Sequence, residues 1–280
     1  MPCVSVIIPT HNRAWALAEA VDSVLGQSFS DFELIVVDDG STDGTQDLLA
    51  AYGGRIRVEV QDHRGVSAAR NRGIACARGE LLAFLDSDDL WRPEKLARQA
   101  AFMQARPEVL ICQTEEVWIR RGVRVNPARR HRGRSGMIFA PSLALCLVSP
   151  SAVMARRGLF AEVGLFDESL PACEDYDLWL RVSVRHPVHL LDEALVVKRG
   201  GHADQLSRAW GLDRYRIRAL AKLLDAGTLT ADQHRAAAAT LRDKCRIYAA
   251  GCRKRRREAE ACRYEALADR FPAPAGNARD

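Results

Sequence analysis

The chain has 280 residues, of which 48% are hydrophobic and 28% are charged. These values are ordinary for a soluble globular protein and exclude a chain dominated by disordered or membrane-spanning segments. The net charge is only +5, but basic residues gather at 120–134 and 253–257, while the first ninety residues are rich in aspartate. Locally basic surfaces favour an anionic partner: a nucleotide-linked substrate, an anionic membrane or nucleic acid.

Strands and helices are expected to alternate through the first ninety residues. The predicted strands cover residues 4–8, 32–37, 55–60 and 81–85, and the predicted helices between them cover 14–25, 45–52 and 65–77. This alternation predicts an α/β fold with a doubly wound, mostly parallel central sheet flanked by helices. No glycine-rich dinucleotide fingerprint or P-loop follows the first strand, which disfavours those two nucleotide-binding folds.

Polar or acidic residues follow three of the predicted strands. They are Thr10-His11-Asn12, Asp38-Asp39 and the run Asp86-Ser87-Asp88-Asp89. In doubly wound sheets ligands bind beyond the carboxyl ends of the strands, so we expect the three endings to form one site. The last run follows a buried apolar strand, and a divalent cation such as Mg²⁺ or Mn²⁺ would offset its charge. An acidic turn that caps a helix after Pro93 is the alternative.

Several ordered motifs together resemble the family 2 glycosyltransferases, which are inverting nucleotide-sugar enzymes with the GT-A fold. The motifs are SVIIPTHNR at 5–13, VVDDGSTDGT at 36–45, GVSAARNRGI at 65–74, LDSDD at 85–89 and GLFDESLPACEDYDLWLR at 164–181. The resemblance covers roughly residues 3–210. It implies a domain that binds a nucleoside diphosphate sugar, with a divalent metal on the diphosphate.

The resemblance also assigns residues to the nucleotide-sugar pocket. These are Pro9, Thr10, His11, Asn12, Arg13, Asp38, Asp39, Arg70, Asp86 and Ser87. Asp39 matches the acid that meets the base or ribose, and the alternative is a turn-forming acid before Gly40. Arg70 matches a basic residue near the nucleotide, where a guanidinium suits phosphate oxygens, and the alternative is a solvated helix arginine.

Two residues are implied as metal-site residues. Asp88 matches the position in the D-x-D pattern that holds Mn²⁺ or Mg²⁺ directly, while Asp86 would meet the ribose or a metal-bound water. Related enzymes use a histidine near the metal or diphosphate at the position of His202, which follows Gly200-Gly201. A lone histidine is otherwise a surface or packed residue. The metal would stabilise the diphosphate as leaving group.

The catalytic residues implied by the resemblance are Glu174 and Asp175. By position, Asp175 would be the base that takes the proton of an acceptor hydroxyl as it attacks the anomeric carbon, with inversion of configuration. Acids are also favoured at a helix N-terminus, so capping of the helix that follows is the alternative. The Q-x-x-R-W signature of processive members is absent, which favours addition of a single sugar.

The expected partners are a nucleoside diphosphate sugar and a glycan or lipid-linked acceptor in surface polysaccharide or glycolipid assembly. No nucleic-acid partner is expected. The predicted domains are 1–210, a helical extension at 211–271 and a disordered tail at 272–280. The run 253–257 could contact anionic lipid, or it could be a solvated helix face. The sequence thus predicts a cytoplasmic protein, and peripheral association with the inner face of the membrane is left open.

Three further expectations complete the sequence picture. The eight cysteines show no Cys-x-x-Cys pair and should be reduced, mostly packed thiols. The residues after Met1 lead directly into a strand, so no signal peptide is expected. The uncharged stretch 135–155 is divided by Pro141 and Pro150 and is predicted to form buried core and pocket wall.

The alternative functions are a nucleotidyltransferase on a similar sheet and a non-catalytic recruitment module with basic helices.

Overall fold

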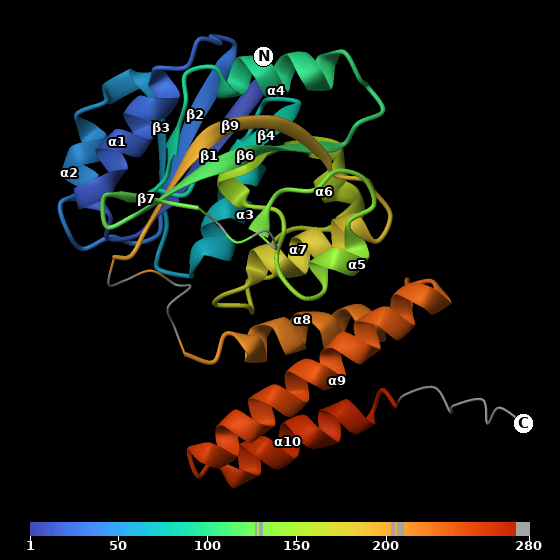
Figure 1. The fold of residues 1–280 in the computed structure, drawn as a ribbon. Coiled ribbons are helices and arrows are strands. Elements are labelled where there is room, and N and C mark those ends of the chain that lie inside the picture. Colours follow the sequence, from blue (N-terminus) through green and yellow to red (C-terminus); the bar gives the residue numbers. More distant parts are fainter. Residues whose placement is uncertain (127, 129–130, 203–204, 206–209, 273–280) are drawn as a thin grey trace, which may run out of the picture.

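The computed structural model describes residues 1–126, 128, 131–202, 205 and 210–272, and it has a mixed α/β fold (Figure 1). The first part contains β1 (Val4–Thr10), α1 (Ala14–Leu25), β2 (Phe32–Asp38), α2 (Thr45–Ala50), β3 (Arg57–Val60), α3 (Val66–Cys76), β4 (Leu81–Phe84), β5 (Leu90–Trp91) and α4 (Lys95–Gln104). The second part contains β6 (Ile111–Arg120), β7 (Val123–Val125), α5 (Phe139–Ser142), β8 (Val153–Arg156), α6 (Arg157–Val163), α7 (Glu174–Ser183), β9 (His189–Gly200), α8 (Asp213–Asp225), α9 (Ala231–Lys254) and α10 (Glu258–Asp269).

The first four strands, β1 to β4, form the predicted parallel half of the sheet. β1 lies between β2 and β4, and β3 pairs with the outer edge of β2, all in parallel. The carboxyl ends of β1 and β2 meet, with Thr10 opposite Asp38. The α/β fold class is therefore confirmed, and these strand ends share one edge of the sheet, as expected.

The second half of the sheet is mixed in direction. Within the described residues the strand order is β3-β2-β1-β4-β8-β6-β9-β5, with β7 beside β6. β8 runs antiparallel to both β4 and β6, while β6 and β9 are parallel to each other. Sequence reasoning placed no strand at β6. The charged residues Glu115 and Glu116 in β6 interrupt its apolar pattern.

The sheet is buried on both faces, because successive side chains of a strand point to opposite sides. Val4, Val6 and Ile8 of β1 pack into a core with α1, α2 and α4. Ile7 packs on the other face with α3, α6 and α7. Gly73 permits the close approach of α3 to β1, since a Cβ there would lie 2.4 Å from Cγ2 of Ile7.

The uncharged stretch 135–155 folds into the protein interior, which confirms its predicted place in the core. It contains α5, a short 3₁₀ helix (Pro150–Ala152) and most of β8. Ile138, Phe139 and Val148 are buried there. Among the described residues, none of the helices combines the length and the apolar character that crossing a bilayer requires.

Helices α8, α9 and α10 form a layer next to α5 and α7, as Figure 1 shows at the bottom of the molecule. Tyr176 and Leu180 of α7 share a buried cluster with Leu220 of α8 and Leu241 of α9. The predicted boundary near residue 210 falls between β9 and α8, and the separate folding of the two parts stays a prediction. The predicted disorder of the tail concerns 273–280, which lie outside the described residues.

One lysine is fully buried at the start of α4. Lys95 has no exposed surface, and its Nζ donates to Oε1 of Gln99 at 2.6 Å and lies 3.9 Å from the ring centre of Trp91. Burial lowers the pKa of Lys95 to about 7. The N-terminal end of a helix also disfavours a positive charge. The folded protein therefore binds this proton more weakly than the unfolded chain does.

Replacing Lys95 by methionine should raise the free energy of unfolding at pH 7 by about 1–3 kcal/mol. Between pH 7 and about 10 the unfolded chain keeps the lysine proton while the folded state has lost it, so this group makes the fold more stable as pH rises. The stability gained by Lys95→Met should accordingly shrink across that window. Urea unfolding of both proteins from pH 6 to 10, with the exposed Lys254→Met as control, measures this difference. A constant difference would contradict the assignment.

Candidate functional site

A large cavity opens at the edge of the sheet where β1, β2 and β4 end. It encloses about 1100 Å³, which is the size of pocket that takes a whole nucleotide sugar. Its wall contains ten of the predicted site residues: Pro9, Thr10, His11, Asn12, Arg13, Asp39, Arg70, Asp86, Ser87 and Asp88. Glu174 and Asp175 from α7 line the same cavity. The structure thus brings the strand endings and the implied catalytic pair together, far apart as they are in sequence.

The loop after β2 is organised by the buried carboxylate of Asp39. Oδ1 accepts from the backbone of Arg64 at 2.9 Å and from Nε2 of Gln61 at 2.7 Å, while Oδ2 accepts from the backbone of Gly65 at 2.7 Å. His63 lies 2.9 Å from Oδ2 through Nδ1. Both oxygens are therefore engaged by protein donors, so Asp39 shapes the cavity wall as a turn-forming acid.

The neighbouring Asp38 lies beneath the cavity instead of in its wall. Its carboxylate accepts from the backbone of Ser41 and from Nε2 of Gln46, both at 3.0 Å. The side chain has no exposed surface. This arrangement supports the turn after β2, and a direct contact of Asp38 with the nucleotide sugar stays a prediction.

Two histidine rings cover the end of β1. His11 and His63 stack with their ring centres 4.0 Å apart, and Nδ1 of His11 lies 2.9 Å from the backbone oxygen of Asp39. Asn12, which has a positive φ of 51°, accepts from the backbone of Thr42 at 2.8 Å. A flat, partly exposed aromatic surface of this kind suits a planar base. Sequence reasoning missed His63, because only the fold brings it next to β1.

The loop after β4 contains a tight turn at residues 86–89, and its acids differ in burial and in hydrogen bonding. The backbone of Asp89 donates to the backbone oxygen of Asp86 at 2.9 Å. The Asp89 carboxylate is buried and accepts from Ser151 Oγ at 2.6 Å and from the backbone of Arg199 at 2.9 Å. Burial raises the pKa of Asp89. Asp89 therefore fixes the turn to β9, and Asp86 and Asp88 are left facing the cavity.

Asp88 and His202 provide a donor pair for a divalent metal. Oδ2 of Asp88 lies 2.7 Å from Nε2 of His202, so oxygen and imidazole donors meet at one point. The carboxylate oxygen of this pair suits Mn²⁺ or Mg²⁺, whereas an imidazole nitrogen is more typical of transition metals such as Zn²⁺ or Fe²⁺. No group of three or more His, Cys, Asp or Glu side chains with the spacing of a metal site occurs in the described part of the chain. The residues fit a metal that takes its remaining ligands from a bound diphosphate and water.

The guanidinium of Arg70 joins the two sides of the cavity. Nη2 donates to Oδ1 of Asp86 at 2.7 Å, and Nη1 donates to Oε1 of Glu174 at 2.5 Å. Arg70 is only 3% exposed. Its two terminal nitrogens are committed to carboxylates, so Arg70 positions these acids, where the sequence suggested a phosphate contact.

Glu174 and Asp175 begin α7 but lie in different environments. Glu174 is buried, and burial raises its pKa while Arg70 opposes the shift. Asp175 is half-buried and lines the cavity, with Oδ1 accepting from the backbone of Tyr176 at 2.7 Å. The preceding Cys173 has a left-handed φ of 61°, which directs the chain sharply into the helix. Of the two acids, Asp175 is the one that an acceptor can reach.

Two cations of the cavity wall were not recognised in the sequence. Lys198 donates through Nζ to Ser149 Oγ at 2.9 Å. Burial lowers the pKa of Lys198, but Glu116 and the cavity aspartates outweigh this effect and raise it. Arg216 of α8 also lines the cavity. Lys198 lies near the end of β9, and Arg216 lies beyond the predicted domain 1–210. No sequence motif around either residue indicated a place in the cavity wall.

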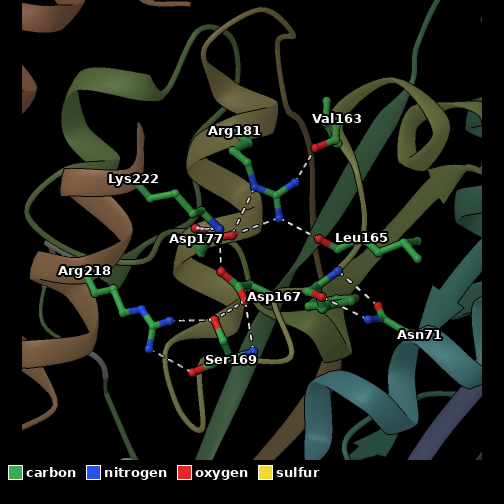
Figure 2. Close-up of polar contacts among 10 residues, drawn as sticks. Asn71, Val163, Leu165, Asp167, Ser169, Asp177, Arg181, Arg218 and Lys222 are labelled. Carbon is green, nitrogen blue, oxygen red and sulfur yellow. Dashed lines mark hydrogen bonds and ion pairs between the residues drawn. The ribbon is translucent and has the colours of Figure 1, made fainter. Parts of the chain in front are cut away.

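The loop from α6 to α7, which forms part of the cavity wall, is held by a polar network around Asp177 (Figure 2). The Asp177 carboxylate accepts from Nε of Arg181 at 3.0 Å and lies 2.6 Å from Nζ of Lys222 on α8. Arg181 in turn donates to the backbone oxygens of Val163 and Leu165. Lys222 also contacts Asp167 at 2.8 Å. This network ties α8 to α7 and to the loop that precedes α7.

Residues 5–164 match the glycosyl transferase family 2, which is more than half of the chain. The fold and the cavity agree with this match, and the chain belongs to that family. It is 30% identical over 215 residues to an uncharacterized glycosyltransferase of Rickettsia felis, covering 74% of this chain and 35% of that protein. The chain thus spans about a third of the length of that relative.

A second relative and a solved structure extend the comparison. The putative teichuronic acid biosynthesis glycosyltransferase TuaG of Bacillus subtilis is 45% identical over 109 residues, which is 38% of this chain and 43% of that one. The mannosyltransferase PcManGT from Pyrobaculum calidifontis, solved with GDP-Man and Mn²⁺, superposes with a TM-score of 0.65 at 18% identity. The superposition covers 98% of this chain and 76% of that one and shows a shared fold.

The substitution Asp177→Asn should lower the free energy of unfolding by about 2 kcal/mol, because it leaves Arg181 without its buried counter-charge and Lys222 with Asp167 alone. Urea denaturation measures the effect. The control is Asp232→Asn, whose exposed carboxylate pairs with Arg235 and should change stability by less than about 0.5 kcal/mol. Equal effects of the two substitutions would show that Asp177 is no more important than a surface acid.

Proposed function

We propose that the protein is a metal-dependent, inverting glycosyltransferase that moves one sugar from a nucleoside diphosphate sugar to a hydroxyl acceptor. The observation that carries the proposal is the Arg70 bridge, which places Asp86 of the donor side and Glu174 of the α7 side within one cavity. A nucleotidyltransferase would need the acids after β4 but would have no use for the pair at the start of α7. Family membership supports the same activity.

The donor would lie over the ends of β1, β2 and β4. The stacked His11 and His63 offer a surface for the base, and Asp86 and Ser87 lie where a ribose would reach the turn after β4. The cavity wall is rich in carboxylates, which by themselves repel a diphosphate. Asp88 and His202 would hold a divalent metal, which supplies positive charge to the diphosphate as it leaves.

The base would be Asp175. Its half-buried carboxylate lines the cavity at the N-terminus of α7. In this proposal Asp175 takes the proton from the acceptor hydroxyl as the hydroxyl oxygen forms a bond to the anomeric carbon and the bond to the diphosphate breaks. Glu174 and Arg70 are positioning residues that hold α7 against the turn after β4.

The acceptor would belong to a surface polysaccharide or a glycolipid, which the name of the Bacillus subtilis relative supports. The turn between α9 and α10 carries Arg255, Arg256 and Arg257 and would allow a peripheral contact with an anionic membrane face. Within that turn Arg257 pairs with Glu260 at 3.4 Å, which reduces the charge available for lipid.

The base assignment is tested by Asp175→Asn. With Mn²⁺ and a panel of uridine, guanosine and thymidine diphosphate sugars, the unchanged protein should slowly hydrolyse the donor that it accepts. Asp175→Asn should lower transfer and hydrolysis by about 10²–10⁴-fold, because the amide cannot take a proton. Donor affinity, measured by calorimetry, should stay within about twofold. Full activity in Asp175→Asn would remove this residue from the mechanism.

The metal assignment is tested without turnover. Asp88→Ala should abolish the dependence of nucleoside diphosphate binding on Mn²⁺ and weaken binding in Mn²⁺ by about 10–100-fold. Calorimetry with Mn²⁺ or with EDTA gives both values. His202→Asn should have the same direction of effect if the imidazole is a ligand. Binding that is equally tight with EDTA in the unchanged protein would argue against a shared metal.

A further inference from the structure

A second, smaller hollow lies where α8 and α9 meet, beside the donor cavity. It encloses about 260 Å³, room for about one sugar ring, and its wall includes Trp210, Arg216, Tyr248, Gly251 and Arg255. Leu212 and Arg216 line both this α8–α9 hollow and the donor cavity. The backbone oxygen of Leu212 accepts from Cys173 Sγ at 3.8 Å, which places this shared wall next to the start of α7.

The α8–α9 hollow has an aromatic wall that remains accessible. Trp210 is 42% exposed, and its ring centre lies 6.0 Å from that of Tyr248. Gly211 has a positive φ of 80°, and a Cβ there would lie 3.5 Å from the Tyr248 hydroxyl oxygen, so the backbone runs close to this ring. Tyr248 itself is only 7% exposed, so Trp210 is the ring that remains open to a partly polar ligand, such as a sugar ring.

Cations surround this aromatic wall. The guanidinium carbons of Arg255 and Arg257 lie 4.9 Å and 4.7 Å from the ring centre of Trp210. Arg216 donates through Nη1 to Asp213 at 3.2 Å, and its buried Nε has no partner among the described residues. A guanidinium with an unused buried donor favours an oxyanion at that position.

The acids near the α8–α9 hollow do not cancel this charge. Asp213 faces both Arg216 at 3.2 Å and Lys244 at 3.6 Å. Glu260 accepts from the Tyr248 hydroxyl at 2.9 Å and pairs with Arg257 at 3.4 Å. Arg255 has no carboxylate within pairing distance among the described residues; it donates to the backbone oxygen of Gly251 at 2.8 Å. The wall therefore keeps an excess of positive charge.

We infer that the α8–α9 hollow is the subsite for the acceptor, and that it takes a sugar bearing a phosphate or carboxylate group. The inference rests on the proposed glycosyl transfer and adds the chemical class of the acceptor. The sugar ring packs on Trp210 and Tyr248, and its anionic group meets Arg216 and Arg255. The shared wall at Leu212 and Arg216 leads from this subsite to Asp175, so a neighbouring hydroxyl reaches the donor cavity.

The direct test is calorimetric binding of sugar probes in the presence of Mn²⁺ and saturating UDP or GDP, which keeps the donor cavity filled. The probes are N-acetylglucosamine 1-phosphate, glucuronic acid, N-acetylglucosamine and inorganic phosphate. At least one of the two anionic sugars should bind at least about tenfold more tightly than the neutral sugar and than phosphate alone. The probe that binds distinguishes a phosphate-bearing from a carboxylate-bearing acceptor. Equal affinity for the neutral sugar would overturn the anionic class.

Two substitutions outside the donor cavity locate the binding. Arg255→Gln should weaken the anionic probe at least about tenfold, while Arg246→Gln, which removes an exposed arginine from the preceding helix α9, should leave it unchanged within about twofold. Gly251→Leu fills the hollow, and leucine is the better helix former, so the thermal midpoint should stay the same or rise while probe binding is lost. Equal loss in Arg255→Gln and Arg246→Gln would reduce the effect to general surface charge and overturn the subsite.

Nucleoside diphosphate affinity of the same variants separates this inference from the proposed function. If the unchanged protein binds a nucleoside diphosphate but not the anionic probe, the subsite alone is overturned. Absence of nucleotide binding with any of the nucleosides overturns the proposed function. A sedimentation assay with phosphatidylcholine vesicles containing phosphatidylglycerol provides the third arm. If Arg255→Gln loses vesicle binding but keeps probe binding, the basic surface serves lipid and the subsite is overturned.

Discussion

The site depends on one buried cation, the guanidinium of Arg70. It lies between a carboxylate from the turn after β4 and a carboxylate from the start of α7, with almost no contact to water. In such surroundings each unpaired charge is costly, so the three groups are stable only together. The Arg70 guanidinium thus links the turn after β4 to the start of α7 in the protein without a ligand.

The rest of the cavity follows from the direction of the strands. Parallel pairing of β1, β2 and β4 brings three loop endings to the same edge, where Asp39 and Asp89 fix their loops through buried bonds. Asp86, Asp88 and Asp175 are then left accessible. The cavity separates acids that shape the protein from acids that can act on a ligand, and burial is what distinguishes them.

This separation also explains how far the sequence could lead. The alternation of strands and helices predicted the parallel half of the sheet, and the motifs predicted which residues would line the cavity. The adjacent Asp38 and Asp39 look equivalent in sequence, and only the structure shows that Asp39 lines the cavity while Asp38 is buried beneath it. β6 was missed because its glutamates hide the apolar pattern. Lys198 and Arg216 gain their place from tertiary packing, which no local pattern encodes.

The packing of α8, α9 and α10 against α7 has a consequence for how such proteins diversify. Tyr176, the residue after Asp175, is buried in the same cluster as Leu220 and Leu241. The α8–α9 hollow is therefore lined by the same helices that bury one side of α7. A related protein that accepts a different molecule here must keep the buried residues of these helices. Sequence changes are then expected at exposed positions such as 210, 247 and 255. Under the proposed function, acceptor choice would then change in small steps, while the strand endings of β1, β2 and β4 are left as they were.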